Sequence, residues 1–167
     1  ITLVIPAKKE KESLPKVLDE LKKFNYQILI VLEENDKETI ESIKNYNCKI
    51  IYQANKGYGD ALTFGIKNVE TELFCIFNAD GSFDPKEIRA MIEHLITKKI
   101  DLVFGSRYQD NGSSDDDTII TLIGNFIFSK IGNIFFNLPI SDILYTFVIG
   151  KTNQVNKLDL RRKDFRF

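Results

Sequence analysis

The sequence predicts an α/β fold, with a mostly parallel central sheet and helices on both of its faces. Over residues 1–105, short apolar stretches rich in β-branched residues alternate with stretches of helical spacing. This alternation is typical of parallel strands joined by helices, and right-handed crossovers place those helices on both faces. Each apolar stretch also ends in polar residues, as expected at the ligand-binding edge of such a sheet.

The expected elements follow one another closely up to residue 105. Strands are expected over residues 1–6, 27–32, 48–53, 73–78 and 101–105. The stretch 27–32 is apolar throughout, which is typical of a strand buried on both faces. Helices are expected over residues 12–24, 37–46, 60–69 and 85–98. Residues 12–24 carry apolar side chains at helical spacing, and Pro15 and Pro85 suit the first turns of their helices.

The stretch after residue 108 breaks this alternation. Residues 111–117 form a polar, acidic loop, and residues 118–138 predict a helix that is more apolar than a solvent-facing one. Residues 140–149 are again apolar around Asp142, and the tail 157–167 is basic. Two interpretations of residues 118–149 stay open. They belong to the core, or part of them lies at a membrane surface and admits a lipid-linked acceptor.

Length and composition narrow the class of protein. The chain has 167 residues and no internal repeat, so we expect a single domain over residues 1–167, cut short at its C-terminus. Its 23 basic and 24 acidic side chains nearly cancel, which argues against a nucleic-acid partner. Cys48 and Cys75 lack metal-site spacing and are expected to be free thiols. With His94 as the single histidine, Ser-His-Asp catalysis is disfavoured.

Polar residues at the ends of the expected strands form a consistent set. They are Pro6-Ala7-Lys8-Lys9-Glu10, Glu33-Glu34-Asn35-Asp36, Asn55-Lys56-Gly57, Asn78-Ala79-Asp80 and Gly105-Ser106-Arg107-Tyr108. Because parallel strands bring their carboxyl ends to one edge, we expect these residues to meet there. Asp80 suits a hard divalent cation that holds a diphosphate. Arg107 suits a phosphate, because its planar fork binds two oxygens.

These motifs, in this order, resemble those of the family 2 inverting glycosyltransferases with a GT-A fold, above all the polyprenyl- and dolichyl-phosphate sugar transferases. Residues 5–10 are similar to that family's first-strand motif, and residues 55–62 to its glycine turn and helix. Asn78-Ala79-Asp80 falls on its Asp-x-Asp motif, and residues 105–108 match its Gly-Ser-Arg-Tyr segment. Asp142 lies where the family carries an acid near the acceptor site. The resemblance covers nearly the whole chain and implies a Rossmann-like nucleotide-sugar transferase architecture.

The resemblance also implies an activity. The chain would be a metal-dependent hexosyltransferase that transfers a sugar, with inversion, from a UDP- or GDP-linked donor. Its donor pocket would be lined by Pro6, Ala7, Glu10, Glu33, Lys56, Gly57, Asn78, Ala79 and Arg107. Asp80 and Asn78 would hold Mg²⁺ or Mn²⁺. The acceptor would be a polyprenyl or dolichyl phosphate, and the protein would lie in the cytoplasm, at the cytoplasmic face of a membrane and in peripheral contact with it.

Arg107 and Asp142 would be the catalytic residues. Arg107 would place positive charge on the leaving diphosphate or on an acceptor phosphate. Asp142 would serve as general base for a hydroxyl acceptor. A phosphate acceptor is already ionised and hardly needs a base, in which case Asp142 would only position other groups. The two roles stay open.

The chain departs from the family's motifs at several positions. Lys8 replaces an aromatic residue, and Glu33 begins the stretch that matches Asp-Asp-Gly-Ser, so the pocket's base preference can differ. Asn78 replaces the first acid of Asp-x-Asp and offers a neutral oxygen, which lowers the expected cation affinity. Thr146 and Val148 replace the glycine and arginine that follow the acceptor-site acid.

Two other functions stay open at this point. The chain could be a catalytically degenerate nucleotide-sugar binding module, which the change at Asn78 favours. It could also be a sugar-phosphate nucleotidylyltransferase, although no glycine- and arginine-rich phosphate loop follows the first strand. A nucleotide-redox domain is disfavoured, because the turn at Gly57-Tyr58-Gly59 lacks a third glycine and follows the third strand.

Overall fold

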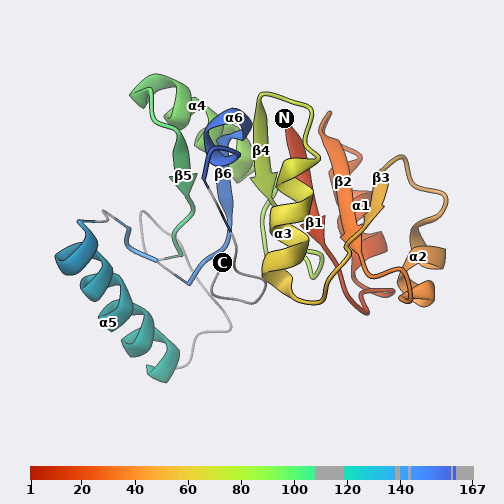
Figure 1. Ribbon diagram of the computed structural model, residues 1–167, viewed down its shortest axis with the longest axis horizontal. Coiled ribbons are helices and arrows are strands. Elements are labelled where there is room, and N and C mark those ends of the chain that lie inside the picture. The colour runs from red at the N-terminus through yellow and green to blue at the C-terminus, as the bar shows by residue number, and fades with distance from the viewer. Residues whose placement is uncertain (108–118, 138–139, 143, 159, 161–167) are drawn as a thin grey trace.

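A computed structural model describes residues 1–107, 119–137, 140–142, 144–158 and 160, and a six-stranded sheet forms its centre (Figure 1). The strands are β1 (Thr2–Pro6), β2 (Gln27–Leu32), β3 (Lys49–Tyr52), β4 (Leu73–Ile76), β5 (Leu102–Phe104) and β6 (Val148–Lys151). The helices are α1 (Leu14–Leu21), α2 (Lys37–Ile43), α3 (Tyr58–Lys67), α4 (Glu87–Lys98), α5 (Ile119–Phe136) and α6 (Thr152–Val155).

The sheet confirms the predicted fold class. Its strand order is β3-β2-β1-β4-β6-β5, in which β1 pairs in parallel with β2 and β4, and β2 pairs in parallel with β3. β6 is antiparallel to both β4 and β5, so β5 points the same way as the first four strands. The five expected strands therefore bring their carboxyl ends to one edge, as a ligand site at that edge requires.

β6 begins inside the apolar stretch 140–149, for which the sequence predicted no strand. It inserts between β4 and β5, and its register sets Ile149 opposite Cys75 and Val103. A four-residue strand whose partners lie far away in the sequence carries almost no local signal. Its glycine is structural, because a Cβ on Gly150 would lie 2.8 Å from Cε1 of Phe74.

The boundaries of several elements also differ from the expected ones. The helix expected over residues 12–24 spans only Leu14–Leu21, and that expected over residues 118–138 spans Ile119–Phe136. α3 begins at Tyr58, two residues earlier than expected. Gly57 precedes it with a φ of 118°, a conformation that glycine adopts without steric cost, so the chain turns directly from the loop into the helix.

Two apolar cores lie on the two faces of the sheet. Leu3 and Ile5 of β1 point into the core under α1, α2 and α4, whereas Val4 points into the core under α3 and α6. The same alternation holds along β2 and β4, as expected for strands buried on both faces. In Figure 1, α3 and α6 lie in front of the sheet and α1 and α4 behind it.

Candidate active site

A cavity of about 570 Å³ opens at the carboxyl ends of β1, β2, β3 and β4. It brings together eight of the predicted site residues, which are Pro6, Ala7, Glu10, Glu33, Gly57, Asn78, Ala79 and Asp80. Lys56 lies outside it, in a shallower depression that it shares with Glu33, Glu34 and Asn35. Arg107 and Asp142 are not among the lining residues. Parallel strand ends are thus enough to gather most of the expected set.

Several residues that line the cavity were not predicted as site residues. They are Lys8, Gln53, Tyr58, Ala61, Leu144 and Thr146. Gln53 donates hydrogen bonds to the backbone oxygens of Asn55 and Gly57, and so shapes the turn before α3. The hydroxyl of Tyr58 donates to Oγ1 of Thr146, and burial raises the pKa of this phenol. Of these residues, Lys8 and Gln53 could have been identified from the sequence, because both lie at the ends of expected strands.

Asp80 stands at the mouth of this cavity, in a tight turn after β4. Its Oδ1 accepts a hydrogen bond of 2.9 Å from the backbone nitrogen of Ser82. The amide nitrogen of Asn78 donates to Oγ of Ser82 at 3.0 Å, so the other atom of that amide is the carbonyl oxygen, a neutral acceptor. Gly81 closes the turn with a φ of 86°. The turn therefore presents one exposed carboxylate and one neutral oxygen to the cavity.

No group of three or more His, Cys, Asp or Glu side chains is arranged to hold a metal ion within the described residues. A preformed cage for a cation is therefore absent from that part of the chain. Asp80 and Asn78 alone would suit an ion of the Mg²⁺ type, which typically takes one or two protein ligands and completes its coordination with substrate phosphates and water. The donor set fits a cation that arrives together with a diphosphate.

Arg107 and Asp142 form a buried ion pair next to this cavity. Nε of Arg107 donates to Oδ2 of Asp142 at 2.8 Å and its Nη2 donates to Oδ1 at 3.0 Å, a bidentate arrangement. The amide nitrogen of Asn125 also donates to Oδ1, at 2.7 Å. The side chain of Asp142 is 0% exposed, and that of Arg107 is 23% exposed. Both carboxylate oxygens of Asp142 are therefore engaged inside the protein.

An aromatic cluster packs against Arg107. The guanidinium of Arg107 lies 5.2 Å from the centre of the Tyr145 ring. Tyr145 packs edge-to-face on Phe83 and Phe147, and burial raises the pKa of its phenol. Arg107 is thus held both by the carboxylate of Asp142 and by the ring of Tyr145.

α5 has an inverted distribution of side chains. Over residues 124–135, the part of α5 whose side chains the structure describes, the buried positions are Asn125, Ser129 and Gly132, which are polar or small. Ser129 and Asn133 donate hydrogen bonds to the backbone oxygens of Ser141 and Ile140. Its exposed positions include six large apolar side chains: Phe126, Ile127, Phe128, Ile131, Ile134 and Phe135.

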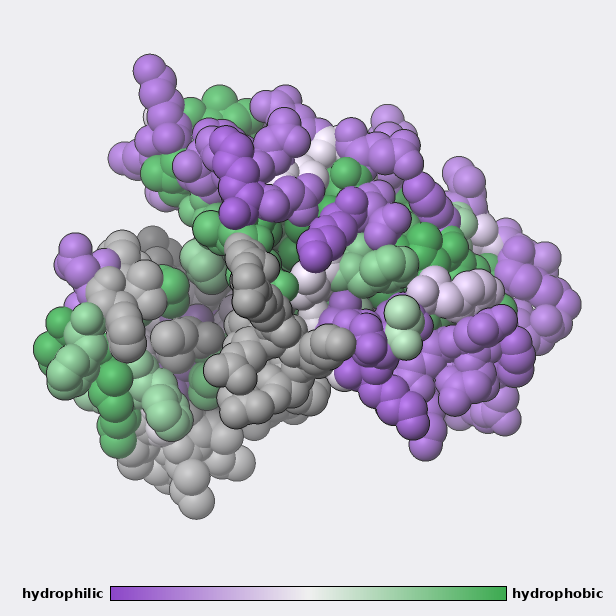
Figure 2. All heavy atoms as spheres, in the orientation of Figure 1, coloured by the Kyte–Doolittle hydropathy of each residue, from purple (hydrophilic) through white to green (hydrophobic). Residues whose placement is uncertain are grey.

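In Figure 2 green, apolar side chains lie over α5, whereas hydrophilic residues dominate the far end of the molecule around α2. A contiguous exposed apolar surface of this kind marks an interaction site. Among the helices that the structure describes, none combines the length and the apolar character needed to cross a bilayer. The exposed face of α5 is therefore suited to contact with an apolar surface.

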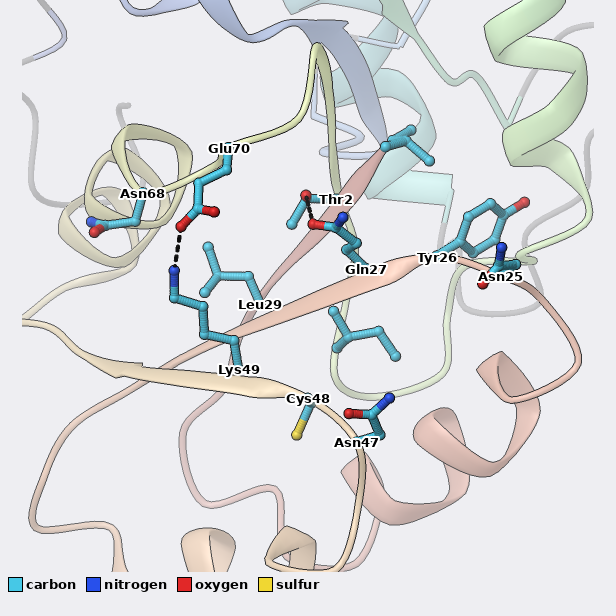
Figure 3. Close-up of a pocket in the computed structure, with 12 residues that line it drawn as sticks. Thr2, Asn25, Tyr26, Gln27, Leu29, Asn47, Cys48, Lys49, Asn68 and Glu70 are labelled. Carbon is cyan, nitrogen blue, oxygen red and sulfur yellow. Dashed lines mark hydrogen bonds and ion pairs between the residues drawn. The ribbon is translucent and has the colours of Figure 1, made fainter.

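A second cavity, of about 460 Å³, lies at the opposite, amino-terminal edge of the sheet (Figure 3). Its wall contains the ion pair between Lys49 and Glu70 and the hydrogen bond between Thr2 and Gln27. Cys48 also lines it. Two pairs of polar side chains are joined there, and β1, β2 and β3 meet this edge by their amino ends, so it lacks the features of a ligand site at the carboxyl edge.

Comparison with solved structures shows that the fold is shared with enzymes. Glucosyl-3-phosphoglycerate synthase from Mycobacterium tuberculosis, solved in complex with Mn²⁺, uridine-diphosphate and glucosyl-3-phosphoglycerate, superposes with a TM-score of 0.74 at 12% identity. The match covers 94% of this chain and 58% of that one. The fold is that of the GT-A glycosyltransferases.

Two relatives in sequence act on lipid phosphates by name. A UDP-N-acetylglucosamine–dolichyl-phosphate N-acetylglucosaminyltransferase of Methanococcus voltae is 26% identical over 147 residues, which cover 75% of this chain and 59% of that protein. A dolichyl-phosphate β-glucosyltransferase of Trichomonas vaginalis is 32% identical over 134 residues, which cover 66% of this chain and 41% of that protein. The chain spans about half the length of the curated relatives it matches.

The family is identified by a family sequence model that matches almost the whole chain. The model of glycosyl transferase family 2 matches residues 2–158. This range contains the strand-end motifs, the turn at Asp80 and the Arg107–Asp142 pair. The match favours a transferase over both alternatives, the degenerate binding module and the nucleotidylyltransferase. The resemblance seen in the sequence is thereby confirmed, and the chain belongs to glycosyl transferase family 2.

Proposed function

We propose that this chain carries the catalytic site of an inverting transferase that moves a sugar from a UDP- or GDP-linked donor to a polyprenyl or dolichyl phosphate. Family membership supports the reaction type. The observation that carries the proposal is the cavity at the carboxyl edge, which Asp80 and Asn78 line from the end of β4 and Glu33 from the end of β2. A nucleotide-sugar would lie along it, with its diphosphate at Asp80.

Mg²⁺ or Mn²⁺ would be held by the carboxylate of Asp80 and the carbonyl oxygen of Asn78. When bound, the ion would offset the negative charge that builds up on the leaving diphosphate. The hydrogen bond from Ser82 to Asp80 fixes the orientation of that carboxylate before any ligand arrives. Because the protein offers one charged ligand, we expect the cation to bind weakly alone and tightly with a nucleoside diphosphate.

The role that we assign to Asp142 is to position Arg107. Both of its oxygens already accept hydrogen bonds from Arg107 and Asn125, so it would have to give up partners in order to take a proton. A phosphate acceptor needs no general base, because it is ionised at neutral pH. Arg107, held beside the cavity, would supply positive charge for the acceptor phosphate or for the diphosphate.

A lipid-linked acceptor is supported by two observations of different kinds. Two relatives carry dolichyl-phosphate transfer in their names. Independently, α5 directs its apolar side chains outward and its polar ones toward residues 140–142, next to Arg107. A helix of this kind lies favourably in the interfacial region of a membrane. It would hold the site close to the head group of a lipid phosphate.

The decisive experiment is a transfer assay on Asp80→Ala. Purified protein is incubated with UDP- and GDP-sugars, Mn²⁺ and either polyprenyl phosphate or 3-phosphoglycerate, and product is measured by mass spectrometry. We expect transfer to polyprenyl phosphate and a loss of about a hundredfold or more in Asp80→Ala. Asp19→Ala, on the outer surface of α1, is the matched control and should keep full activity. Unchanged turnover in Asp80→Ala would refute the proposal, and transfer to 3-phosphoglycerate alone would refute the lipid acceptor.

A further inference from the structure

Asn125 is a buried polar side chain on α5 to which the proposed reaction assigns no role. It is 1% exposed, although the outward face of the same helix is apolar. Its amide nitrogen donates to Oδ1 of Asp142 at 2.7 Å, and its amide oxygen accepts from the backbone nitrogen of Leu144 at 3.4 Å. Both polar atoms of the amide therefore have partners, and both partners lie on the chain between α5 and β6.

The two partners of Asn125 belong to different parts of the proposed site. Leu144 lines the donor cavity together with Asp80. Asp142 instead holds Arg107. Its Oδ2 accepts from the backbone nitrogen of Arg107 at 3.2 Å and from Nε at 2.8 Å, and its Oδ1 accepts from Nη2 at 3.0 Å. One amide of α5 thus joins the support of Arg107 to the wall of the donor cavity.

The chemistry of these two contacts favours an amide at position 125. The carboxylate of Asp142 accepts hydrogen bonds, whereas the backbone nitrogen of Leu144 donates one. An amide supplies a donor for the first and an acceptor for the second. A carboxylate would supply acceptors alone, and an apolar side chain would supply neither. A buried polar group that loses its partner is strongly unfavourable, above all a charged one.

The next two turns of α5 contact the same part of the chain through its backbone. Ser129 donates to the backbone oxygen of Ser141. Asn133 donates to the backbone oxygens of Ser129 and Ile140. With Asn125 these residues are spaced four apart, so they share one face of the helix. Asn133 therefore fastens the same helix to the same part of the chain, but away from Asp142, which makes it a matched control.

We propose that Asn125 is a positioning residue of the transfer reaction, which fixes the carboxylate of Asp142 and, through it, the guanidinium of Arg107 beside the donor cavity. The inference rests on the proposed function, in which Arg107 supplies positive charge to a phosphate. A charge that is held in place before the reaction needs no reorganisation during it, and this is where fixed charges contribute most to rate. The helix α5 thereby takes part in the chemistry of the site through its inward face.

A double-mutant cycle on turnover tests whether Asn125 acts through Arg107. Asn125→Leu removes both hydrogen bonds at nearly constant size and should lower kcat/KM for transfer to polyprenyl phosphate by about tenfold to a hundredfold. In the Arg107→Ala background the same substitution should have almost no further effect. Asn133→Ala should leave kcat/KM close to the native value, and thermal melting establishes that each variant is folded. Full additivity of Asn125→Leu and Arg107→Ala would overturn the inference.

Asn125→Asp gives a pH profile that a purely structural role would not change. Two carboxyl groups this close share a proton up to a pH above the range in which a lone aspartate ionises. The shared O–H replaces the amide N–H, and once it is lost the two carboxylates repel each other and Arg107 is displaced. Relative to the native chain, activity should therefore fall as the pH rises from about 5 to about 8.

Two ionisable groups that the structure describes next to Asp142 do not produce this profile. Arg107 stays charged across the range, and burial raises the pKa of the Tyr145 phenol further above it. A fall in activity confined to Asn125→Asp therefore reports the introduced carboxyl group. A profile parallel to that of the native chain would overturn the inference.

The Nε–H resonance of Arg107 reports the position of the guanidinium without any substrate. In proton–nitrogen correlation spectra of the isotope-labelled chain, it is identified by its absence from Arg107→Lys. We expect Asn125→Leu to shift this resonance and to speed its exchange with water by about tenfold or more, and Asn133→Ala to leave it in place. An unchanged resonance in Asn125→Leu would overturn the inference. Absence of transfer by a native chain whose resonance responds as expected would refute the proposed function and leave the placement of Arg107 by Asn125 standing.

Discussion

Both carboxylate oxygens of Asp142 accept hydrogen bonds, and this limits the roles that the residue can have. An isolated buried carboxylate is costly, and the structure compensates it with the guanidinium of Arg107 and the amide of Asn125. The same contacts fix Arg107, whose guanidinium also lies against the ring of Tyr145. At the scale of single residues, the proposed site therefore combines Asp80, an exposed aspartate held by a turn and lining the cavity, with Arg107, an arginine held in place that does not line it.

Removing one partner of the buried pair should cost more than removing both. We expect Asp142→Ala to destabilise the fold by about 3 kcal/mol, because Arg107 and Asn125 lose their acceptor. The double variant Arg107→Ala/Asp142→Ala should be no less stable than Asp142→Ala, so the two changes are strongly non-additive. Urea unfolding of the four proteins measures this coupling. The surface pair of Lys22 and Asp19 should show no measurable coupling in the same cycle, and additive costs at Arg107 and Asp142 would contradict the argument.

α3 owes its position on the sheet to a glycine. A Cβ on Gly65 would overlap Cγ1 of Val4 and lie 2.9 Å from Cγ2 of Val31, so the helix can lie against β1 and β2 only without that atom. This packing sets the first turn of α3, with Gly57 and Tyr58, against the cavity. The close packing at Gly65 therefore helps to set the position of the cavity wall that α3 forms.

Gly65→Ala should destabilise the fold by about 1 to 3 kcal/mol through overpacking. Gly124→Ala in α5 is the matched control, because a Cβ there would meet nothing within 4 Å. That substitution should be neutral or stabilising by up to about 1 kcal/mol, since alanine is the better helix former. Chemical denaturation of both variants gives the comparison. Equal effects at the two positions would mean that the close approach of α3 to the sheet is not what Gly65 provides.

α5 should bind membranes through its outward face. In flotation with phosphatidylcholine vesicles, with and without phosphatidylglycerol, we expect the native chain to rise with the vesicles. Replacing Ile134 and Phe135, each 75% exposed, by aspartate should lower the partitioning by about tenfold or more. Ile96→Asp removes a comparably exposed apolar side chain from α4 and should have no effect. If analytical ultracentrifugation instead shows a dimer that the double variant abolishes, a second copy covers α5 and the membrane assignment is wrong.

On the scale of the whole molecule, the parallel sheet could be predicted because each strand carries its own signal. The run 27–32 is apolar throughout, and the helices between strands show helical spacing. β6 could not be predicted in this way. Its four residues pair with β4 and β5, and Gly150 is needed because Phe74 lies beneath it, a requirement that only the folded chain reveals. Local patterns thus specify the order of the elements, whereas long-range pairing completes the sheet.

For the site, too, the sequence predicted the part that follows from the order of the strands, but not the part that depends on packing. Asp80, Glu33 and Pro6 meet because parallel strands end at one edge, so their grouping follows from the topology alone. The contact of Lys8 with Glu33 and the burial of Asp142 depend on how two loops and α5 pack, and no spacing in the sequence encodes them. The roles proposed for all of these residues stay predictions, and Arg107, Asp142 and Lys56 lie outside the main cavity.

The free energy of unfolding of the whole fold should decrease at alkaline pH because of one core residue. Cys75 lies in β4, fully buried between β1 and β6, and this burial raises the pKa of its thiol above the ordinary value of 9.0. Above pH 9.0 the unfolded chain loses a proton that the folded chain keeps. Stability should therefore fall as the pH rises, by up to about 1.4 kcal/mol per pH unit for this group.

Burial raises the pKa values of Tyr58 and Tyr145 as well, so they add to the decline above their ordinary value of 10.0. Cys75→Ala isolates the contribution of the thiol, because it removes one titrating group and keeps both phenols. Urea unfolding between pH 8 and about 10.5 should show a shallower decline for this variant than for the native chain, whatever the difference between the two at neutral pH. Parallel curves would mean that the thiol ionises equally well in the folded core, and would overturn the argument from its complete burial in β4, between β1 and β6.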